Sequence, residues 1–182
     1  MAFPSGRHTS VTDVDLTEKG RKDARALCGP LMERGPFDGV YSSPMLRALR
    51  TALLAGYAVP ELSPGLREWG YGRYEGMTTA EIRRGNPAWS VFRCGAPGGE
   101  SPEAVSARCD ELLRKWNEKG HRQVLCFAHG DILRALATRW LGLELCFAEH
   151  LHLDPGSLSR LGWEHEVPAL HLWNYRPSAP GG

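Results

Sequence analysis

The sequence predicts a three-layer α/β/α fold with a mostly parallel sheet. Short apolar runs alternate with helical patterns along most of the chain, which is the order of a βαβ architecture. The run at residues 124–128 is apolar without alternation, as expected for a strand buried on both faces. At 182 residues with 42% hydrophobic content, the chain can fill one sizeable core and is short for two. We therefore expect a single domain over residues 1–176 and a flexible tail over residues 177–182.

The N-terminal part of the chain predicts a helix, a strand and a second helix. Thr17 can cap a helix that Gly35 ends, and residues 38–42 have the pattern of a short strand. Pro44 suits the first turn of a helix that continues to Tyr57. The apolar stripe of the first helix comprises Ala24, Leu27, Cys28, Leu31 and Met32.

The middle of the chain predicts loops and two further helices. Residues 63–77 are rich in Gly, Arg and aromatics without a clean period, which is typical of a functional loop. Residues 78–84 predict a short helix, and residues 86–100 an irregular segment. Ser101 before a proline signals a helix start, and Gly120 stops that helix. Its apolar face carries Val105, Cys109, Leu112 and Trp116.

The C-terminal part begins with the strand at residues 124–128. A helix follows it and ends at Gly142. Residues 149–153, 157–163 and 169–174 predict the remaining strands. The stripe of the helix comprises Ile132, Leu133, Leu136, Ala137 and Trp140.

Composition excludes several classes of partner. The 22 basic and 21 acidic residues are spread along the chain, so the net charge of +1 predicts no surface for nucleic acid. No apolar stretch is long enough to span a membrane, and the first residues predict no signal peptide. Five cysteines without a Cys-x-x-Cys pair are typical of reduced thiols. We expect a cytoplasmic protein.

His129 is expected where a strand ends and a helix begins. Gly130 permits the sharp turn, and Asp131 can cap the helix. Ligands of α/β proteins collect at this edge of the sheet, and the unpaired N–H groups of a helix start favour anions. A lone histidine here also fits a buried side chain that is satisfied by hydrogen bonds.

Residues 41–48 repeat this arrangement. A strand again ends in small polar residues, among them Ser43, and enters a helix with Arg47 one turn in. A guanidinium there can bind two phosphate oxygens and neutralise charge that develops in phosphoryl transfer. Alone, Arg47 fits a solvated helix arginine; at the same sheet edge as His129 it indicates a phosphate site.

Residues 66–77 contain two candidate proton donors, Glu68 and Glu75. A carboxyl group beside aromatic rings has its pKa raised by desolvation, as a donor to a leaving alkoxide requires. The alternative is a loop carboxylate paired with Arg67 or Arg73. Candidates to shape a lid over a pocket are Tyr71, which we also consider a substrate-binding residue, Arg73, Trp89 and Phe92.

Five motifs follow one another along the chain. They lie at residues 13–20, 43–52, 68–76, 98–101 and 128–130. Together they resemble the histidine phosphatase superfamily, also called phosphoglycerate mutase-like proteins, from Gly6 to Asn174. Within this superfamily, residues 68–77 and 127–130 are similar to the branch of sedoheptulose-bisphosphatase-like enzymes.

The resemblance implies a phosphohistidine mechanism without a metal or other cofactor, in which a histidine attacks phosphorus and water later hydrolyses the intermediate. It implies that His129 is the second histidine of the pocket, Arg47 its second arginine and Glu68 the proton donor. Glu75 would be a structural glutamate. The implied substrate contacts are His8, Thr9, Ser43, Gly130 and Arg134. The ligand would be phosphate or a small phosphorylated metabolite; its identity, phosphatase against mutase, and monomer against homodimer stay open.

The sequence departs from the family at the nucleophile. The family carries it in Arg-His-Gly at the end of a first apolar strand, and no such motif occurs here. Residues 7–9 read Arg-His-Thr, follow no strand, and precede Asp13 and Thr17 as the loop after the nucleophile does. We therefore expect the chain to lack the first central strand and the attacking group. We expect little phosphatase activity, and aggregation through the unpaired strand edge.

Two explanations of this departure are considered, with a third functional class beside them. We favour a shortened reading frame of a normal phosphatase over a family member that binds a phosphate ligand without catalysis. A metallohydrolase is the third class, because His150 and His152 lie two apart, with His165, Glu166 and His171 following. Their spacing matches no familiar ligand set, so solvated or cross-strand histidines are the simpler interpretation.

Overall fold

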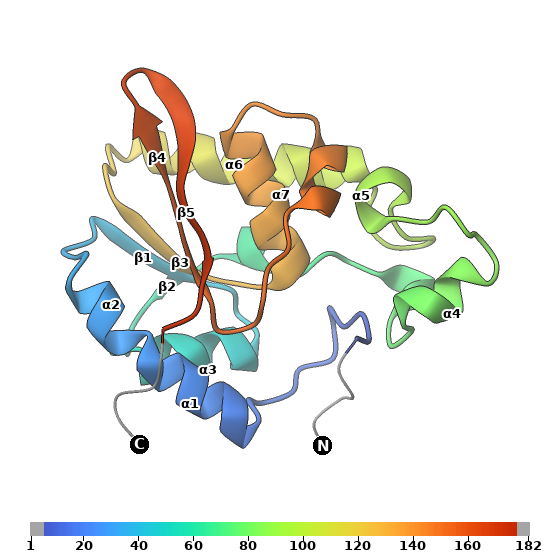
Figure 1. The fold of residues 1–182 in the computed structure, drawn as a ribbon, viewed down its shortest axis with the longest axis horizontal. Helices are drawn as coiled ribbons and strands as arrows, with labels where there is room; N and C mark the ends of the chain where they lie inside the picture. Colours follow the sequence, from blue (N-terminus) through green and yellow to red (C-terminus); the bar gives the residue numbers. More distant parts are fainter. Residues whose placement is uncertain (1–5, 178–182) are drawn as a thin grey trace.

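The computed structural model describes residues 6–177 and has the three-layer α/β/α architecture that the sequence predicts (Figure 1). Its central sheet holds three parallel strands in the order β2-β1-β3, and Ser42 of β1 pairs with Phe127 of β3. The carboxyl ends of β1 and β3 therefore lie side by side, which brings the segments after them to one edge of the sheet. The strands are β1 (Gly39–Ser42), β2 (Glu61–Leu62) and β3 (Val124–Phe127).

Helices cover both faces of this sheet (Figure 1). On one face, Leu125 and Phe127 pack with Leu27, Leu31 and residues of α3 in one apolar cluster. On the other face, a larger cluster combines β1 with α6 and α7. Burial on both faces explains the uninterrupted apolar pattern of β3. The helices are α1 (Glu18–Ala26), α2 (Cys28–Met32) and α3 (Leu46–Leu54) on the first face, and α6 (Pro102–Glu118) and α7 (Gly130–Trp140) on the second.

The segment between β2 and α6 forms a lobe beside the sheet (Figure 1). Its helix α4 begins with a capping box, in which Thr78 and Glu81 satisfy each other's backbone N–H groups. The loop predicted at residues 63–77 contains only two short turns. The elements of the lobe are η1 (Pro64–Leu66), η2 (Gly72–Tyr74), α4 (Thr79–Arg83) and α5 (Val91–Cys94), and η3 (Leu145–His150) contacts α5 from the C-terminal part.

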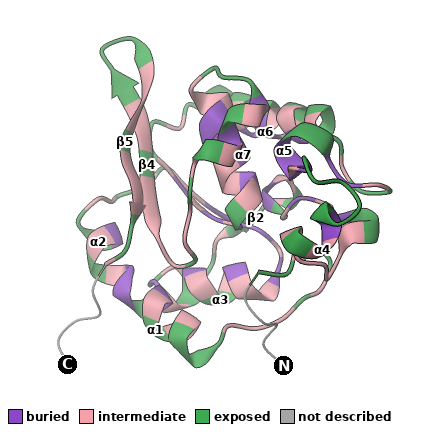
Figure 2. Cartoon of the chain, turned by 45° about the vertical axis from the view of Figure 1, so that its right-hand side comes forward, coloured by how far each residue is buried: buried purple, intermediate pink, exposed green. Residues whose placement is uncertain are grey.

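The C-terminal strands β4 (Leu158–Glu164) and β5 (Val167–Tyr175) form a separate antiparallel hairpin. Neither strand contains a buried residue (Figure 2). Among residues 6–177, no strand pairs with the edge of β3 that faces away from β1. This edge is where a further strand of the sheet would pair.

Several expectations about the elements were wrong. Residues 86–100, expected to be irregular, contain the one-turn helix α5, which is too short to show a helical period. The predicted first helix breaks into α1 and α2 at Leu27, because Pro30 has no N–H to donate to Ala26 and its ring crowds that carbonyl. Met32 is 73% exposed and does not join the apolar stripe. Residues 149–153 form no strand, since η3 extends to His150 and the following extended backbone has no partner strand in the described part of the chain. Residues 178–182 of the expected tail lie outside the described residues.

No helix among residues 6–177 combines the length and the apolar character that crossing a bilayer requires.

Candidate functional site

His129 lies between β3 and α7 and is 7% exposed. Its Nδ1 is 3.0 Å from Nε of Arg47, and its Nε2 is 2.8 Å from Oγ of Ser43. Because Nε of arginine can only donate, Nδ1 must accept, and the ring proton is on Nε2. Burial, and then the charges of Arg47 and Arg108, lower the pKa of His129 to about 3. The imidazole is therefore neutral near pH 7, with its N–H directed at Ser43.

Arg47 comes from the first turn of α3 and binds three groups. Besides His129, its Nη1 donates to the carbonyl of Thr12 at 3.0 Å and its Nη2 to the carbonyl of Thr9 at 3.2 Å. A guanidinium has five N–H groups. Three of them make these contacts with described residues, so two are left for a ligand. Burial lowers the pKa of Arg47 below its ordinary value, but an arginine stays charged near neutral pH.

Glu68 occupies the start of α7. Its Oε1 accepts from the N–H of Trp69 at 2.9 Å and of Ile132 at 3.0 Å, and its Oε2 accepts from the N–H of Asp131 at 3.2 Å. Two of the helix N–H groups expected to be open to an anion, those of Asp131 and Ile132, are thus already bound. The expected cap by Asp131 is also wrong, because that side chain accepts from Tyr71 at 2.7 Å and from Arg134 at 2.9 Å.

The surroundings of Glu68 suit a proton donor. Burial, and then the negative charge of Asp131, raise the pKa of Glu68 to about 7, against three backbone hydrogen bonds that lower it. A carboxyl group with this pKa is partly protonated at neutral pH and can give up its proton there. Gly130 lies against it, since a Cβ atom at Gly130 would be 3.9 Å from Oε2 of Glu68.

Glu75 anchors residues 10–12 of the loop that precedes α1. Its carboxylate accepts hydrogen bonds from the backbone and hydroxyl groups of Ser10 and Thr12 and from the N–H of Val11. Burial alone would raise the pKa of Glu75, but the hydrogen bonds from Ser10 and Thr12 outweigh it and keep the pKa below its ordinary value. Glu75 and Arg47 therefore hold the same loop from two sides.

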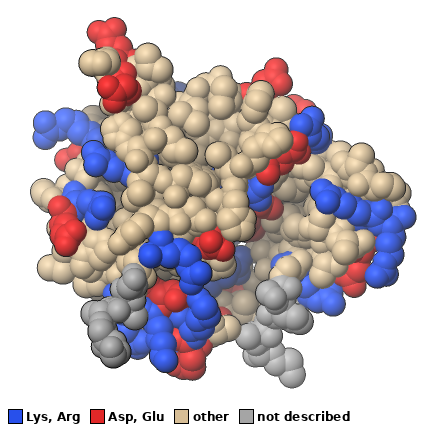
Figure 3. Space-filling view, viewed as in Figure 1, with Lys and Arg blue, Asp and Glu red and all other residues tan. Residues whose placement is uncertain are grey.

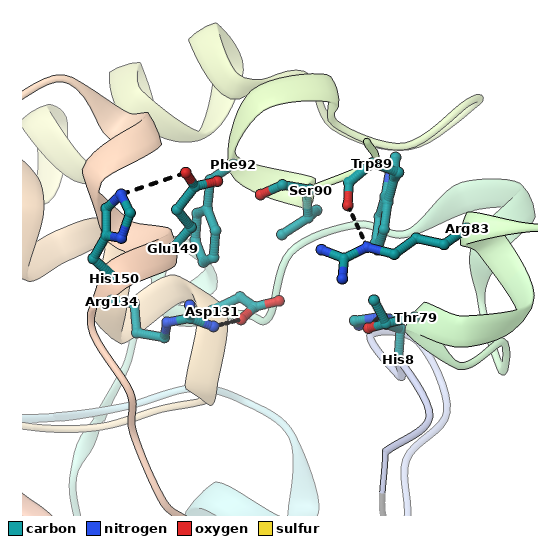
Figure 4. Close-up of a pocket in the computed structure, with 11 residues that line it drawn as sticks. His8, Thr79, Arg83, Trp89, Ser90, Phe92, Asp131, Arg134, Glu149 and His150 are labelled. Carbon is teal, nitrogen blue, oxygen red and sulfur yellow. Dashed lines mark hydrogen bonds and ion pairs between the residues drawn. The ribbon is translucent and has the colours of Figure 1, made fainter. Parts of the chain in front are cut away.

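A cavity of about 450 Å³ opens between α7, η3 and the lobe (Figure 4). His8 lies in its wall, where its Nε2 is 3.0 Å from Oγ1 of Thr79 and its ring centroid is 4.7 Å from that of Tyr71. Burial lowers the pKa of His8, against the charges of Asp131 and Glu75. The lining residues are His8, Thr79, Arg83, Trp89, Ser90, Val91, Phe92, Asp131, Arg134, Glu149 and His150.

The structure thus divides the predicted residues between two neighbouring regions. Ser43 contacts His129 directly, and Thr9 contacts Arg47 through its carbonyl. His8 and Arg134 line the cavity instead, as do the lid candidates Trp89 and Phe92, whereas Arg73 does not. The hydroxyl of the buried Tyr71 points to Asp131, and burial raises the pKa of Tyr71 well above its ordinary value.

The C-terminal histidines do not gather as a metal centre would require. Each of His150, His152 and His165 lies nearest a carboxylate adjacent or nearly adjacent in sequence, at 3.3 to 3.5 Å. Within residues 6–177, no three His, Cys, Asp or Glu side chains come close enough to hold a metal ion. Burial raises the pKa of both Cys109 and Cys126 to about 12, so these thiols stay protonated near neutral pH.

Sequence reasoning missed two residues of the site. The sequence predicts Asp131 only as a helix cap, although its position two residues after His129 places it at the sheet edge. Arg83 was part of an expected helix with no functional signal. Its presence in the cavity depends on the packing of α4 against distant segments, which no local pattern reveals.

Comparisons with known proteins agree on one family. The profile of the histidine phosphatase superfamily (branch 1) matches residues 3–176. An acid phosphatase of Mycobacterium tuberculosis is 41% identical over 91% of this chain and 82% of its own length. The sedoheptulose 1,7-bisphosphatase of Saccharomyces cerevisiae is 31% identical over 76% of this chain and 63% of its own length.

Two solved structures of mycobacterial proteins superpose closely on this chain. A Mycobacterium tuberculosis protein known as an open reading frame product superposes with a TM-score of 0.91 at 39% identity, covering 95% of this chain and 91% of the other. A mycobacterial glucosyl-3-phosphoglycerate phosphatase in complex with inorganic phosphate superposes with a TM-score of 0.80 at 27% identity, covering 94% and 92% of the two chains.

Proposed function

Because the chain belongs to the histidine phosphatase superfamily, we propose that the pocket around His129 binds the phosphoryl group of a small phosphomonoester, a sugar phosphate or a similar metabolite. The observation that carries this proposal is the cluster of Arg47, His129 and Ser43. It presents a fixed positive charge, a neutral imidazole N–H and a hydroxyl at one point of the sheet edge. Each of these groups can donate a hydrogen bond to a phosphate oxygen.

The chemistry of this site follows from its protonation states. Arg47 neutralises charge on the phosphoryl oxygens. The Nε2–H of His129 donates to one of these oxygens in place of Ser43. When the ester P–O bond breaks, the leaving oxygen takes the proton of Glu68. The phosphoryl group would pass to a nucleophile, which in this family is the histidine of the Arg-His-Gly motif that does not occur in these 182 residues.

We further propose that the 182 residues bind such a ligand but turn it over very slowly. The only histidine of the N-terminal segment, His8, bonds Thr79 and stacks near Tyr71, while His129 bonds Arg47 and Ser43. Loss of a nucleophile from a set of cooperating groups typically costs about 10⁶ in turnover. The alternative function, a phosphate-ligand-binding protein without catalysis, uses the same contacts. We expect either activity in the cytoplasm, given the five free cysteines.

Binding of inorganic phosphate, measured by titration calorimetry, tests the proposed pocket. We expect Arg47→Ala to weaken binding at least about tenfold, since hydrogen bonds to a charged group contribute about 1.5–3 kcal/mol each. Arg50→Ala is the matched control, because Arg50 lies on the same helix and only approaches Asp15 at 3.9 Å. Equal affinities of the two variants would overturn the proposal.

Release of phosphate from p-nitrophenyl phosphate tests the proposed lack of turnover. We expect the 182 residues to match the uncatalysed reaction within the error of the assay, and His8→Ala to change nothing. Turnover that disappears in His8→Ala would show instead that His8 is the nucleophile.

A further inference from the structure

The cavity of about 450 Å³ adjoins the first turn of α7, whereas the proposed proton donor Glu68 itself lines a second cavity of about 420 Å³. Asp131 joins the two regions, because its N–H donates to Oε2 of Glu68 at 3.2 Å while its side chain lines the cavity. If Glu68 protonates the leaving oxygen, the rest of the leaving group extends past the first turn of α7. The cavity between α7 and the lobe, whose lining residues Figure 4 shows, can then receive it.

Most charges in the cavity wall are already compensated. The carboxylate of Asp131 pairs with Arg134 at 2.9 Å. The carboxylate of Glu149 accepts three hydrogen bonds from Arg93, which lies outside the cavity lining. Arg83 is the exception, because among residues 6–177 no carboxylate lies within ion-pairing distance of it. The wall therefore carries one uncompensated positive charge.

Arg83 is held with this charge toward the cavity. Its Nε donates to the carbonyl of Trp89 at 2.9 Å, and the Trp89 ring is fixed in turn by a hydrogen bond from Nε1 to the carbonyl of Gly95 at 2.9 Å. The end of the guanidinium points into the cavity (Figure 4). On the surface, basic side chains gather on the lobe that carries α4, and the surface is hollowed between this lobe and the rest of the molecule (Figure 3).

We propose that the leaving group of the substrate carries a second anionic group, a carboxylate or a second phosphate, and that Arg83 binds it. This inference rests on the proposed phosphomonoester function. The two terminal nitrogens of a guanidinium match the paired oxygens of either anion. Neutral polar groups beside it, the hydroxyls of Thr79 and Ser90, suit the hydroxyl groups of such a metabolite. Arg83 is thus a specificity-determining residue.

Matched ligand pairs test this assignment by calorimetry on the full chain. Glycerol 3-phosphate against 3-phosphoglycerate isolates a carboxylate, and fructose 6-phosphate against fructose 1,6-bisphosphate isolates a second phosphate. We expect the wild type to bind at least one doubly anionic ligand about tenfold or more tightly than its partner, and the pair that responds identifies the anion. Arg83→Gln should abolish that preference by weakening the binding of the doubly anionic ligand. Arg84→Gln is the control, since Arg84 is exposed as Arg83 is but does not line the cavity.

The outcomes separate the two proposals. If inorganic phosphate binds through Arg47 but neither pair shows a preference, the role of Arg83 is wrong and the phosphate site stands. The role of Arg83 is equally wrong if Arg83→Gln weakens both members of a pair to the same extent. If inorganic phosphate binding does not depend on Arg47, the proposed function itself fails.

Discussion

The Nε–H of Arg47 donates to Nδ1 of His129 over 3.0 Å, and this contact fixes the state of the imidazole. A doubly protonated ring has no lone pair on Nδ1 and would meet a cation at that point. The neutral ring with its proton on Nε2 is the form that can both accept from Arg47 and donate to Ser43. Two groups from segments 82 residues apart therefore set each other's role.

The neutrality of His129 predicts a loss of stability in acid. The pKa of His129 is about 3 in the folded protein, against an ordinary value of 6.5. Between these values the unfolded chain binds a proton that the native state does not. The free energy of unfolding therefore falls as the pH falls from about 6.5 toward 3, by at most about 1.4 kcal/mol per pH unit from this residue.

We expect His129→Gln to remove this contribution. Urea unfolding at about pH 7, 6 and 5 measures it as the difference in slope between variant and wild type. His152→Gln serves as control, because the His152 side chain is 80% exposed. An unchanged pH slope in His129→Gln would mean that the buried ring is protonated after all.

Glu68 has the opposite effect on the free energy of unfolding as the pH falls. Its pKa is about 7 in the folded protein, above the ordinary 4.5, so between these values the native state holds a proton that the unfolded chain lacks. Glu68 therefore adds stability as the pH falls from about 7 to 4.5, at no more than about 1.4 kcal/mol per pH unit. We expect Glu68→Gln to make the protein lose stability more steeply over this range than the wild type does.

Mutation of Asp131 can isolate the part of the Glu68 pKa shift that the negative charge of Asp131 causes. We expect Asp131→Asn to lower the pKa of Glu68, because it removes the nearby negative charge. A carbon-13 NMR titration of the Glu68 carboxyl measures the change directly. Asp110→Asn, which only breaks a surface pair with Arg139, should leave the titration where it is. A Glu68 titration that Asp131→Asn does not move would leave burial as the sole cause.

The unpaired edge of β3 predicts self-association. Among residues 6–177 no strand pairs with it, although Leu125 and Phe127 are buried and Cys126 packs against the main cluster. An apolar strand with free backbone groups is a template for another strand. We expect light scattering to show a mass that rises with protein concentration. A monomer with a cooperative melt at every concentration would contradict this expectation.

The sequence was informative where a local pattern determines the structure. The apolar run into His129 predicted β3 and the start of α7, because a doubly buried strand and a helix stripe each have a distinct period. The break at Leu27 was missed although Pro30 signalled it. The two-residue strand β2 is too short for any pattern to reveal.

The candidate site was harder to predict because its contacts cross the chain. Arg47 and His129 could be assigned to one sheet edge, since parallel strands end together. The position of Glu68 on the N–H groups of α7 joins residues 63 and 64 apart in sequence, and that of His8 beside Thr79 joins residues 71 apart. Only the packing of the lobe brings these groups together.

Glu75 is expected to control the site from a distance. Its carboxylate holds residues 10–12, and the carbonyls of Thr9 and Thr12 orient the guanidinium of Arg47. Glu75→Gln replaces one acceptor oxygen by a donor and leaves part of these groups unsatisfied. We expect it to lower the free energy of unfolding by about 1–3 kcal/mol.

The same change should weaken inorganic phosphate binding about tenfold while Arg47 itself is intact, because a less ordered guanidinium must be fixed when the ligand binds. Hydrogen exchange of the amides at residues 8–13 should accelerate in Glu75→Gln and not in Glu103→Gln, which changes an exposed carboxylate on α6. Faster exchange with unchanged phosphate affinity would mean that Arg47 holds its orientation without the loop. Unchanged exchange would mean that the loop does not depend on Glu75.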